Sequence, residues 1–176
     1  MPNFSNIVNA IDKPKYKAKH ITTFQNARDI VQSLKTAEYD SRSTSAQLKK
    51  YFCEPNQKAT CAKVWYFLRN ELKYYAEPKT DQTSKTLSRM LNDCLYKGGT
   101  VDCKHYATFA VGVLRACGIN AWFSFAGQNK NEKKPNHAYC TALVNNELIT
   151  IDPCRKNFNS ECKYWYKWNV PPIKNN

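Results

Sequence analysis

The stretch GGTVDCKHYATFAVGVLRACGIN, residues 98–120, places a glycine pair, an aspartate and a cysteine directly before a run of small apolar residues. Asp102 is a good N-cap residue, so the stretch predicts a helix that begins at Cys103 and ends at Cys117. Gly118 predicts the stop, because glycine accepts the positive φ angle that follows many helices. One face carries small and medium-sized side chains, namely Cys103, Ala107, Ala110, Leu114 and Cys117. Such a face can pack closely against a sheet.

The position of Cys103 bears on its chemistry. At the first position of a helix a thiol lies beside free backbone N–H groups and the positive end of the helix dipole, which favours the thiolate. The carboxylate of Asp102 opposes this effect slightly, because a neighbouring negative charge disfavours a second one. The thiolate is the nucleophilic form of cysteine. Cys103 is therefore the candidate nucleophile.

Helical patterns precede Cys103 and strand patterns follow it, which predicts an α+β fold. Apolar spacing predicts helices over residues 24–37 (N-cap at Thr22-Thr23), 45–53, 58–76 (ended by Glu77-Pro78) and 87–97. The third has a core-facing stripe of Cys61, Val64, Trp65, Leu68, Leu72 and Tyr75. Aromatic and β-branched residues predict strands over 121–127, 137–144 and 147–152. The fold expected is a group of N-terminal helices plus a central cysteine-bearing helix packed on an antiparallel sheet.

The last two strands predict a contact between His137 and Asp152. Asn145-Asn146 suits a two-residue hairpin turn, since asparagine tolerates positive φ. With this turn Tyr139 lies opposite Asp152, and His137, two residues away, shares the face of Tyr139. His137 and Asp152 are then diagonal neighbours within reach of an imidazole–carboxylate hydrogen bond.

His137 is also the histidine best placed to serve as a base for a thiol. The chain has three histidines. His20 lies in a basic segment, and His105 follows Cys103 by two helical positions and so points away from it. Cys103, His137 and Asp152 then form, in chain order, a nucleophile, a general base and a residue that orients the base.

At these residues the chain resembles the transglutaminase-like superfamily of papain-like thiol enzymes. The motifs that carry the resemblance are VDCKHYATFAVGVLRACGI, NHAYCTALV and LITIDP, with LRNELKYYAEP upstream, over about residues 60–155. The resemblance implies that Cys103 is the nucleophile, His137 the general base and Asp152 its orienting partner. Val101 stands where the family commonly has glycine, and Cys154 where a small polar residue is common. Small basic members of this kind also resemble proteins encoded by tailed bacteriophages, which suggests a virion component.

Three segments are expected from composition: a basic N-terminal arm over 1–20, the transglutaminase-like domain over 21–155, and a basic aromatic tail over 156–176. The net charge of +13 comes from 27 Lys and Arg against 14 Asp and Glu. It indicates either attraction to nucleic acid or to an acidic protein, or simply a solvated basic surface. The tail motif KYWYKW suits base stacking or, alternatively, an amphipathic strand docked on the domain. We expect no membrane span and, without a signal-peptide pattern, a cytoplasmic or virion location.

The eight cysteines contain no CxxC pair, which argues against zinc-ribbon and thioredoxin-like sites. Most are expected to be reduced, with Cys61, Cys94 and Cys117 as small buried hydrophobes. A zinc site built from Cys103, His137, Cys140 and Cys154 is the alternative considered. It is disfavoured because Cys140 falls on the strand face opposite to His137. No metal or cofactor is expected.

The function expected is thiol-dependent acyl chemistry on peptide or isopeptide bonds, as in a cysteine peptidase or amidase. Attack on a carbonyl gives an acyl-enzyme, which water hydrolyses or an amine converts into a cross-link. The alternatives are a catalytically silent structural or interaction protein that retains the fold, and a nucleic-acid-binding protein. The expected partner is a protein or peptide substrate or, for the structural alternative, a protein assembly bound through the arm and the tail.

Overall fold

The computed structural model describes residues 3–21, 27–78, 81–131 and 135–170, and it has the predicted α+β architecture. Its helices are α1 (Phe4–Asn9), α2 (Ala27–Asp40), α3 (Arg42–Phe52), α4 (Gln57–Glu71), α5 (Leu87–Tyr96) and α6 (Cys103–Ala116). Its strands are β1 (Lys19–Ile21), β2 (Gln82–Ser84), β3 (Asn120–Gly127), β4 (His137–Val144), β5 (Glu147–Ile151) and β6 (Tyr166–Val170). In the part of the chain that the structure describes, no helix combines the length and apolar character that crossing a membrane requires.

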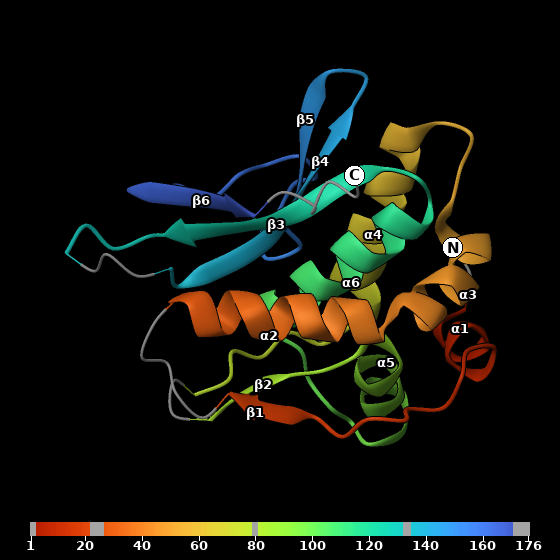
Figure 1. Cartoon of the computed structure of the whole chain (residues 1–176). Coiled ribbons are helices and arrows are strands. Elements are labelled where there is room, and N and C mark those ends of the chain that lie inside the picture. Colours follow the sequence, from red (N-terminus) through yellow and green to blue (C-terminus); the bar gives the residue numbers. More distant parts are fainter. Residues whose placement is uncertain (1–2, 22–26, 79–80, 132–134, 171–176) are drawn as a thin grey trace.

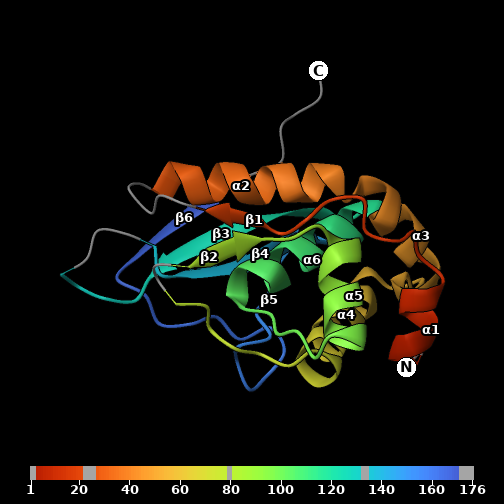
Figure 2. The same ribbon diagram turned by 90° about the horizontal axis from the view of Figure 1, so that it is seen from below.

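Helix α6 lies at the centre of the molecule (Figure 1). It contacts β3 and β4 of the sheet on one side and α2, α3 and α4 on the others, so nearly its whole surface is buried. Gly112 permits the close approach of α3, because a Cβ atom there would lie 2.8 Å from the hydroxyl oxygen of Ser45. The view from below shows α2 running along one edge of the molecule (Figure 2).

The main sheet is antiparallel, with strand order β5-β4-β3-β6, and β1 and β2 form a separate antiparallel pair. The predicted hairpin between β4 and β5 is confirmed. Asn145 and Asn146 have φ angles of 50° and 66°, and Val144 pairs with Glu147 as expected. This register places His137 and Asp152 on one face of the sheet.

Helix α4 ends earlier than its sequence pattern predicts. It stops at Glu71 instead of continuing to residue 76, and Tyr75 is exposed instead of joining the core stripe. The chain beyond Leu72 is extended because it pairs with Val101, whose N–H donates to the carbonyl of Lys73 at 3.1 Å. Backbone pairing with a distant segment therefore overrides the helical periodicity. The expected N-cap of the helix over 24–37, Thr22-Thr23, lies outside the described residues.

Part of the segment expected to be a basic arm, residues 1–20, packs on the domain. Residues 4–9 form α1, whose Ile7 and Val8 are buried in the main core together with Ile11. The described part of the predicted tail, residues 156–170, also contributes to the domain, since β6 pairs with β3 along the edge of the sheet. Of the two alternatives predicted for the tail, residues 166–170 therefore match the strand docked on the domain.

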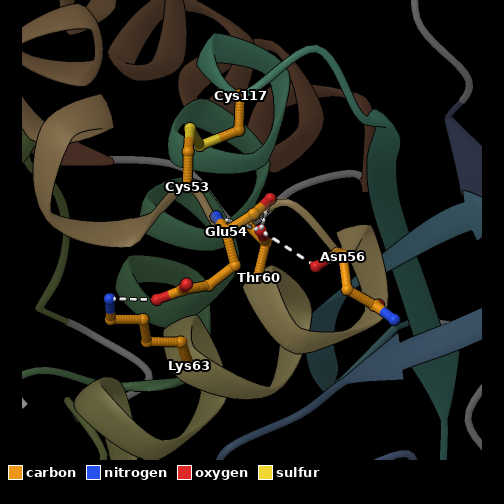
Figure 3. Close-up of a disulfide and its surroundings, with 6 residues drawn as sticks. All are labelled: Cys53, Glu54, Asn56, Thr60, Lys63 and Cys117. Carbon is orange, nitrogen blue, oxygen red and sulfur yellow. Dashed lines mark hydrogen bonds and ion pairs between the residues drawn. A yellow bond between two sulfur atoms is a disulfide. The ribbon is translucent and has the colours of Figure 1, made fainter.

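One of the cysteine predictions is wrong. Cys117 at the end of α6 forms a disulfide with Cys53 at the end of α3, with a Cα–Cα distance of 5.6 Å (Figure 3). Beside it, the side chain of Asn56 caps α4, and Glu54 forms an ion pair with Lys63. The disulfide joins two helix ends that are 64 residues apart in sequence. Among the described residues the remaining cysteines are free, including the predicted hydrophobes Cys61 and Cys94.

Candidate active site

Cys103 is the first residue of α6, as predicted, and is partly exposed. The carboxylate of Asp102 caps the helix by accepting the backbone N–H groups of Lys104 at 3.1 Å and His105 at 3.5 Å. His105 accepts the backbone N–H of Asp102 through Nδ1 at 3.2 Å, which completes a capping box. His105 therefore has a structural role at this helix end. The cap leaves the backbone N–H of Cys103 itself as the natural donor to an oxyanion.

The predicted contact between His137 and Asp152 is present. His137 is the first residue of β4, Asp152 follows β5 directly, and Nε2 of His137 lies 2.8 Å from Oδ2 of Asp152. The two side chains are 9% and 1% exposed, so water does not compete for this hydrogen bond. The His137 ring also stacks on Tyr139, with ring centroids 5.8 Å apart, which fixes its plane. Cys103 and His137 line the same small cavity, and Cys103 is close enough to affect the pKa of His137, so the structure brings all three predicted site residues together.

The electrostatics of His137 are dominated by its two partners. Burial alone would lower the pKa of the imidazole, but hydrogen bonds to Asp152 and Cys103 and the negative charge of each raise it to about 10. An imidazole with such a pKa keeps its proton at neutral pH. His137 can therefore carry the proton that a cysteine nucleophile gives up to its base.

Two side chains of α4 hold the orienting carboxylate in place. The indole N–H of Trp65 donates to the backbone carbonyl of Asp152 at 2.9 Å, and Arg69 donates to that of Pro153 at 2.9 Å. Oδ1 of Asp152 accepts the backbone N–H of Cys154 at 3.1 Å. The sequence patterns assign Trp65 to the core only. Its buried indole N–H, which needs an acceptor, was the one available signal for this second role.

A buried cation lies beside the nucleophile. Lys104 is 4% exposed, and its Nζ contacts the carboxylate of Asp102, Oε1 of Gln82 at 2.5 Å and Oε2 of Glu77 at 3.3 Å. Burial alone would raise the pKa of Asp102, but contacts with His105 and Lys104 hold it well below its usual range. The negative charge of Asp102 is thus compensated locally.

A small cavity of ≈ 60 Å³ opens beside the thiol. Its lining includes Cys103, His137, Ile30 of α2, Gln82 of β2, Phe125 of β3 and Ala138 of β4. The amide of Gln82 donates to the carbonyls of Glu77 and Pro78 at 2.7 and 2.9 Å, so it is already occupied by the protein. The cavity therefore offers mainly apolar contacts next to the reactive sulfur.

The zinc site that the sequence suggested as an alternative does not form from its expected residues. Cys140 lies in the main core on the other face of β4, as the strand alternation predicted, and Cys154 is exposed. Within the described residues, one different group has metal-ligating atoms that all lie within 4.8 Å of one another: His137, Asp152 and Cys162. The sequence indicates no role for Cys162, because nothing in the tail pattern predicts that it folds back onto the site.

Comparison with known proteins bears on the family and on the fold. Residues 46–153 match the family model described as the transglutaminase-like superfamily. A crystal structure of a candidate protease from Parabacteroides distasonis is similar, with a TM-score of 0.52 and 11% identity over 74% of this chain. A candidate cysteine protease from Cytophaga hutchinsonii has a TM-score of 0.43 and 16% identity over 77% of this chain.

The chain spans only 27% and 41% of the lengths of these two solved structures. At such identities the first likeness bears on the fold alone. A search of curated proteins finds no match. The family match covers well over half of the chain and includes Cys103, His137 and Asp152, so the protein belongs to the transglutaminase-like superfamily.

Proposed function

We propose that the protein is a cysteine peptidase or amidase that acts on peptide or isopeptide bonds through Cys103, His137 and Asp152. The observation that carries the proposal is the arrangement around one imidazole. Nε2 of His137 bonds Asp152 at 2.8 Å, which leaves Nδ1 to exchange a proton with the Cys103 sulfur. This is the geometry that a nucleophile, base and orienting acid require.

In the proposed reaction the Cys103 sulfur attacks the substrate carbonyl carbon. The carbonyl π bond opens to an oxyanion, which accepts a hydrogen bond from the backbone N–H of Cys103. The C–N bond then breaks, His137 gives its Nδ1 proton to the leaving amine, and a thioester remains on Cys103. Water, deprotonated by His137, hydrolyses the thioester and restores the thiolate–imidazolium pair.

The surroundings support a peptide-like substrate. The mainly apolar cavity beside the thiol would accept an apolar group next to the scissile carbonyl. The similar solved structures include a candidate protease and a candidate cysteine protease. Resolution by an amine in place of water would turn the same acyl-enzyme into a cross-linking reaction, which product analysis distinguishes.

Capture with an electrophilic acyl probe tests the proposal. The wild type should form one covalent adduct at neutral pH, located at Cys103 by mass spectrometry of peptides, and Cys103→Ala should form none there. Cys154→Ala is the matched control, since Cys154 is an exposed free thiol close to the site, and it should retain the adduct. Equal labelling of Cys103 and of the other accessible thiols would contradict the proposal. It would favour a silent structural or interaction protein that keeps the fold.

A further inference from the structure

A third potential metal ligand lies behind the catalytic pair. Cys162 comes from the segment between β5 and β6, and it is 3% exposed in a small cluster with Ala126 and Tyr139. Its sulfur, an imidazole nitrogen of His137 and a carboxylate oxygen of Asp152 all lie within 4.8 Å of one another. The proposed reaction uses His137 and Asp152 and leaves Cys162 unexplained.

The three side chains offer the ligand set that zinc prefers. Zinc binds thiolate, imidazole and carboxylate at about 2.0–2.3 Å, so the ligand atoms of a tetrahedral site lie about 3.3–3.8 Å apart. The pair at 2.8 Å needs to open modestly to admit an ion, and the separations that involve the Cys162 sulfur, at most 4.8 Å, need only a small adjustment. One carboxylate and one thiolate also neutralise the charge of Zn²⁺, which permits a buried complex without an unpaired charge.

We propose that His137, Asp152 and Cys162 form a zinc-binding site, and that zinc bound there switches off the Cys103 nucleophile. The ion replaces the proton on Nε2 of His137, and both this proton and the S–H proton of Cys162 are released to solvent. Asp152 becomes a ligand of the ion, so the hydrogen bond that orients the His137 ring toward Cys103 is lost and the ring no longer serves as the base.

The ion site can be tested without any assumption about catalysis. Co²⁺ is added as a zinc substitute to the full chain carrying Cys103→Ala, which removes the other sulfur near His137. One equivalent should bind and give the near-ultraviolet charge-transfer absorption of a thiolate–cobalt bond. Zn²⁺ should displace it at one equivalent.

Cys162→Ser in the same background should lose this absorption and bind zinc about 100-fold more weakly or worse, because a hydroxyl is a poor substitute for a thiolate ligand. Cys154→Ser is the matched control and should keep both properties. Cys162→Ala, with thermal unfolding of each variant, separates loss of a ligand from loss of the fold. An unchanged absorption in Cys162→Ser would overturn the site.

The switch rests on the proposed function and is measured separately. Zinc at one equivalent should slow probe capture by Cys103 at least about tenfold in the wild type, and a chelator should restore the rate. In Cys162→Ser the ratio of rates with and without zinc should be close to one. Zinc that binds with the expected absorption but leaves capture unchanged would overturn the switch. Absence of any capture in the metal-free wild type would instead contradict the proposed function and leave the ion site supported.

Discussion

The two ends of α6 each carry a cysteine, and the two cysteines differ in chemistry. Cys103 lies at the N-terminus, where free N–H groups and the helix dipole favour a thiolate, and it faces His137. Cys117 lies just beyond the C-terminus, where carbonyl groups disfavour a negative charge, and it is joined to Cys53. The same residue type is therefore placed for reactivity at one end of a rigid helix and for cross-linking at the other.

The reactive end of α6 depends on more neighbouring groups than the cross-linked end does. A disulfide requires only that two backbones approach, here at a Cα–Cα distance of 5.6 Å. The nucleophile requires a base, an acid that orients the base, and compensation of the nearby Asp102 charge. These groups come from β4, from the residue after β5, and from Lys104. Each of these groups can be removed by a single substitution, so the effects at the reactive end and at the cross-linked end can be measured separately and compared.

The largest effect should come from Asp152→Asn. Loss of the carboxylate removes the acceptor that fixes the tautomer of His137, so the rate of probe capture by Cys103 should fall about 10³-fold. The chain contains a matched control in His20 and Asp81, an exposed pair 3.0 Å apart whose side chains are 65% and 67% exposed. Asp81→Asn should leave the capture rate within about twofold, because exposed ion pairs contribute little. Similar losses in both variants would mean that the buried pair has no special role.

The next effect concerns the cross-linked end. A disulfide closing a loop of 64 residues is expected to stabilise the fold by about 2–4 kcal/mol, chiefly by restricting the unfolded chain. Cys53→Ala combined with Cys117→Ala should lower the free energy of unfolding by this amount in urea titrations. Cys94→Ala, which removes a half-buried free thiol, is the control and should cost less. Dithiothreitol should destabilise the wild type and leave the double variant unchanged; equal sensitivity of both would contradict the assignment.

The reactive end was accessible from the sequence because its signals are local. Asp102 at an N-cap position and Asn145-Asn146 at a two-residue turn determine, respectively, where α6 begins and which face His137 shares with Asp152. Period-two alternation then excludes Cys140 from that face. Local spacing and turn chemistry were sufficient for these three inferences.

The features that were missed all depend on contacts between segments far apart in sequence. Cys53 and Cys117 pair across 64 residues, and the early end of α4 depends on backbone pairing with Val101. Cys162 approaches the site only because the chain after β5 folds back across the sheet. Such contacts leave no periodic trace in a single sequence, so residue spacing alone could not predict them.

A smaller effect is expected for Lys104→Met. The variant keeps a long apolar side chain but leaves the buried carboxylate of Asp102 without its lysine partner, which places less compensated negative charge beside the thiol. The rate of iodoacetamide alkylation of Cys103 at neutral pH should fall about tenfold, since only the thiolate reacts. Lys58→Met, which breaks an exposed ion pair with Glu147, should leave the rate unchanged. Preserved alkylation in Lys104→Met would show that the helix end alone sustains the reactive form.

The smallest expected effect is on the free energy of unfolding and comes from backbone strain at the cross-linked end of α6. Gly118 has a φ angle of +77°, and a Cβ atom added there would meet nothing within 4 Å, so substitution introduces backbone strain without a clash. Gly118→Ala should therefore lower the free energy of unfolding by about 1 kcal/mol, whereas Gly118→Asn should cost less because asparagine tolerates this conformation. Neither variant should alter capture at Cys103, because α6 is held along its length by β3, β4 and the surrounding helices. A change in capture that exceeds the change in stability would show that strain at one end of α6 reaches the other, and that the two ends are not independent.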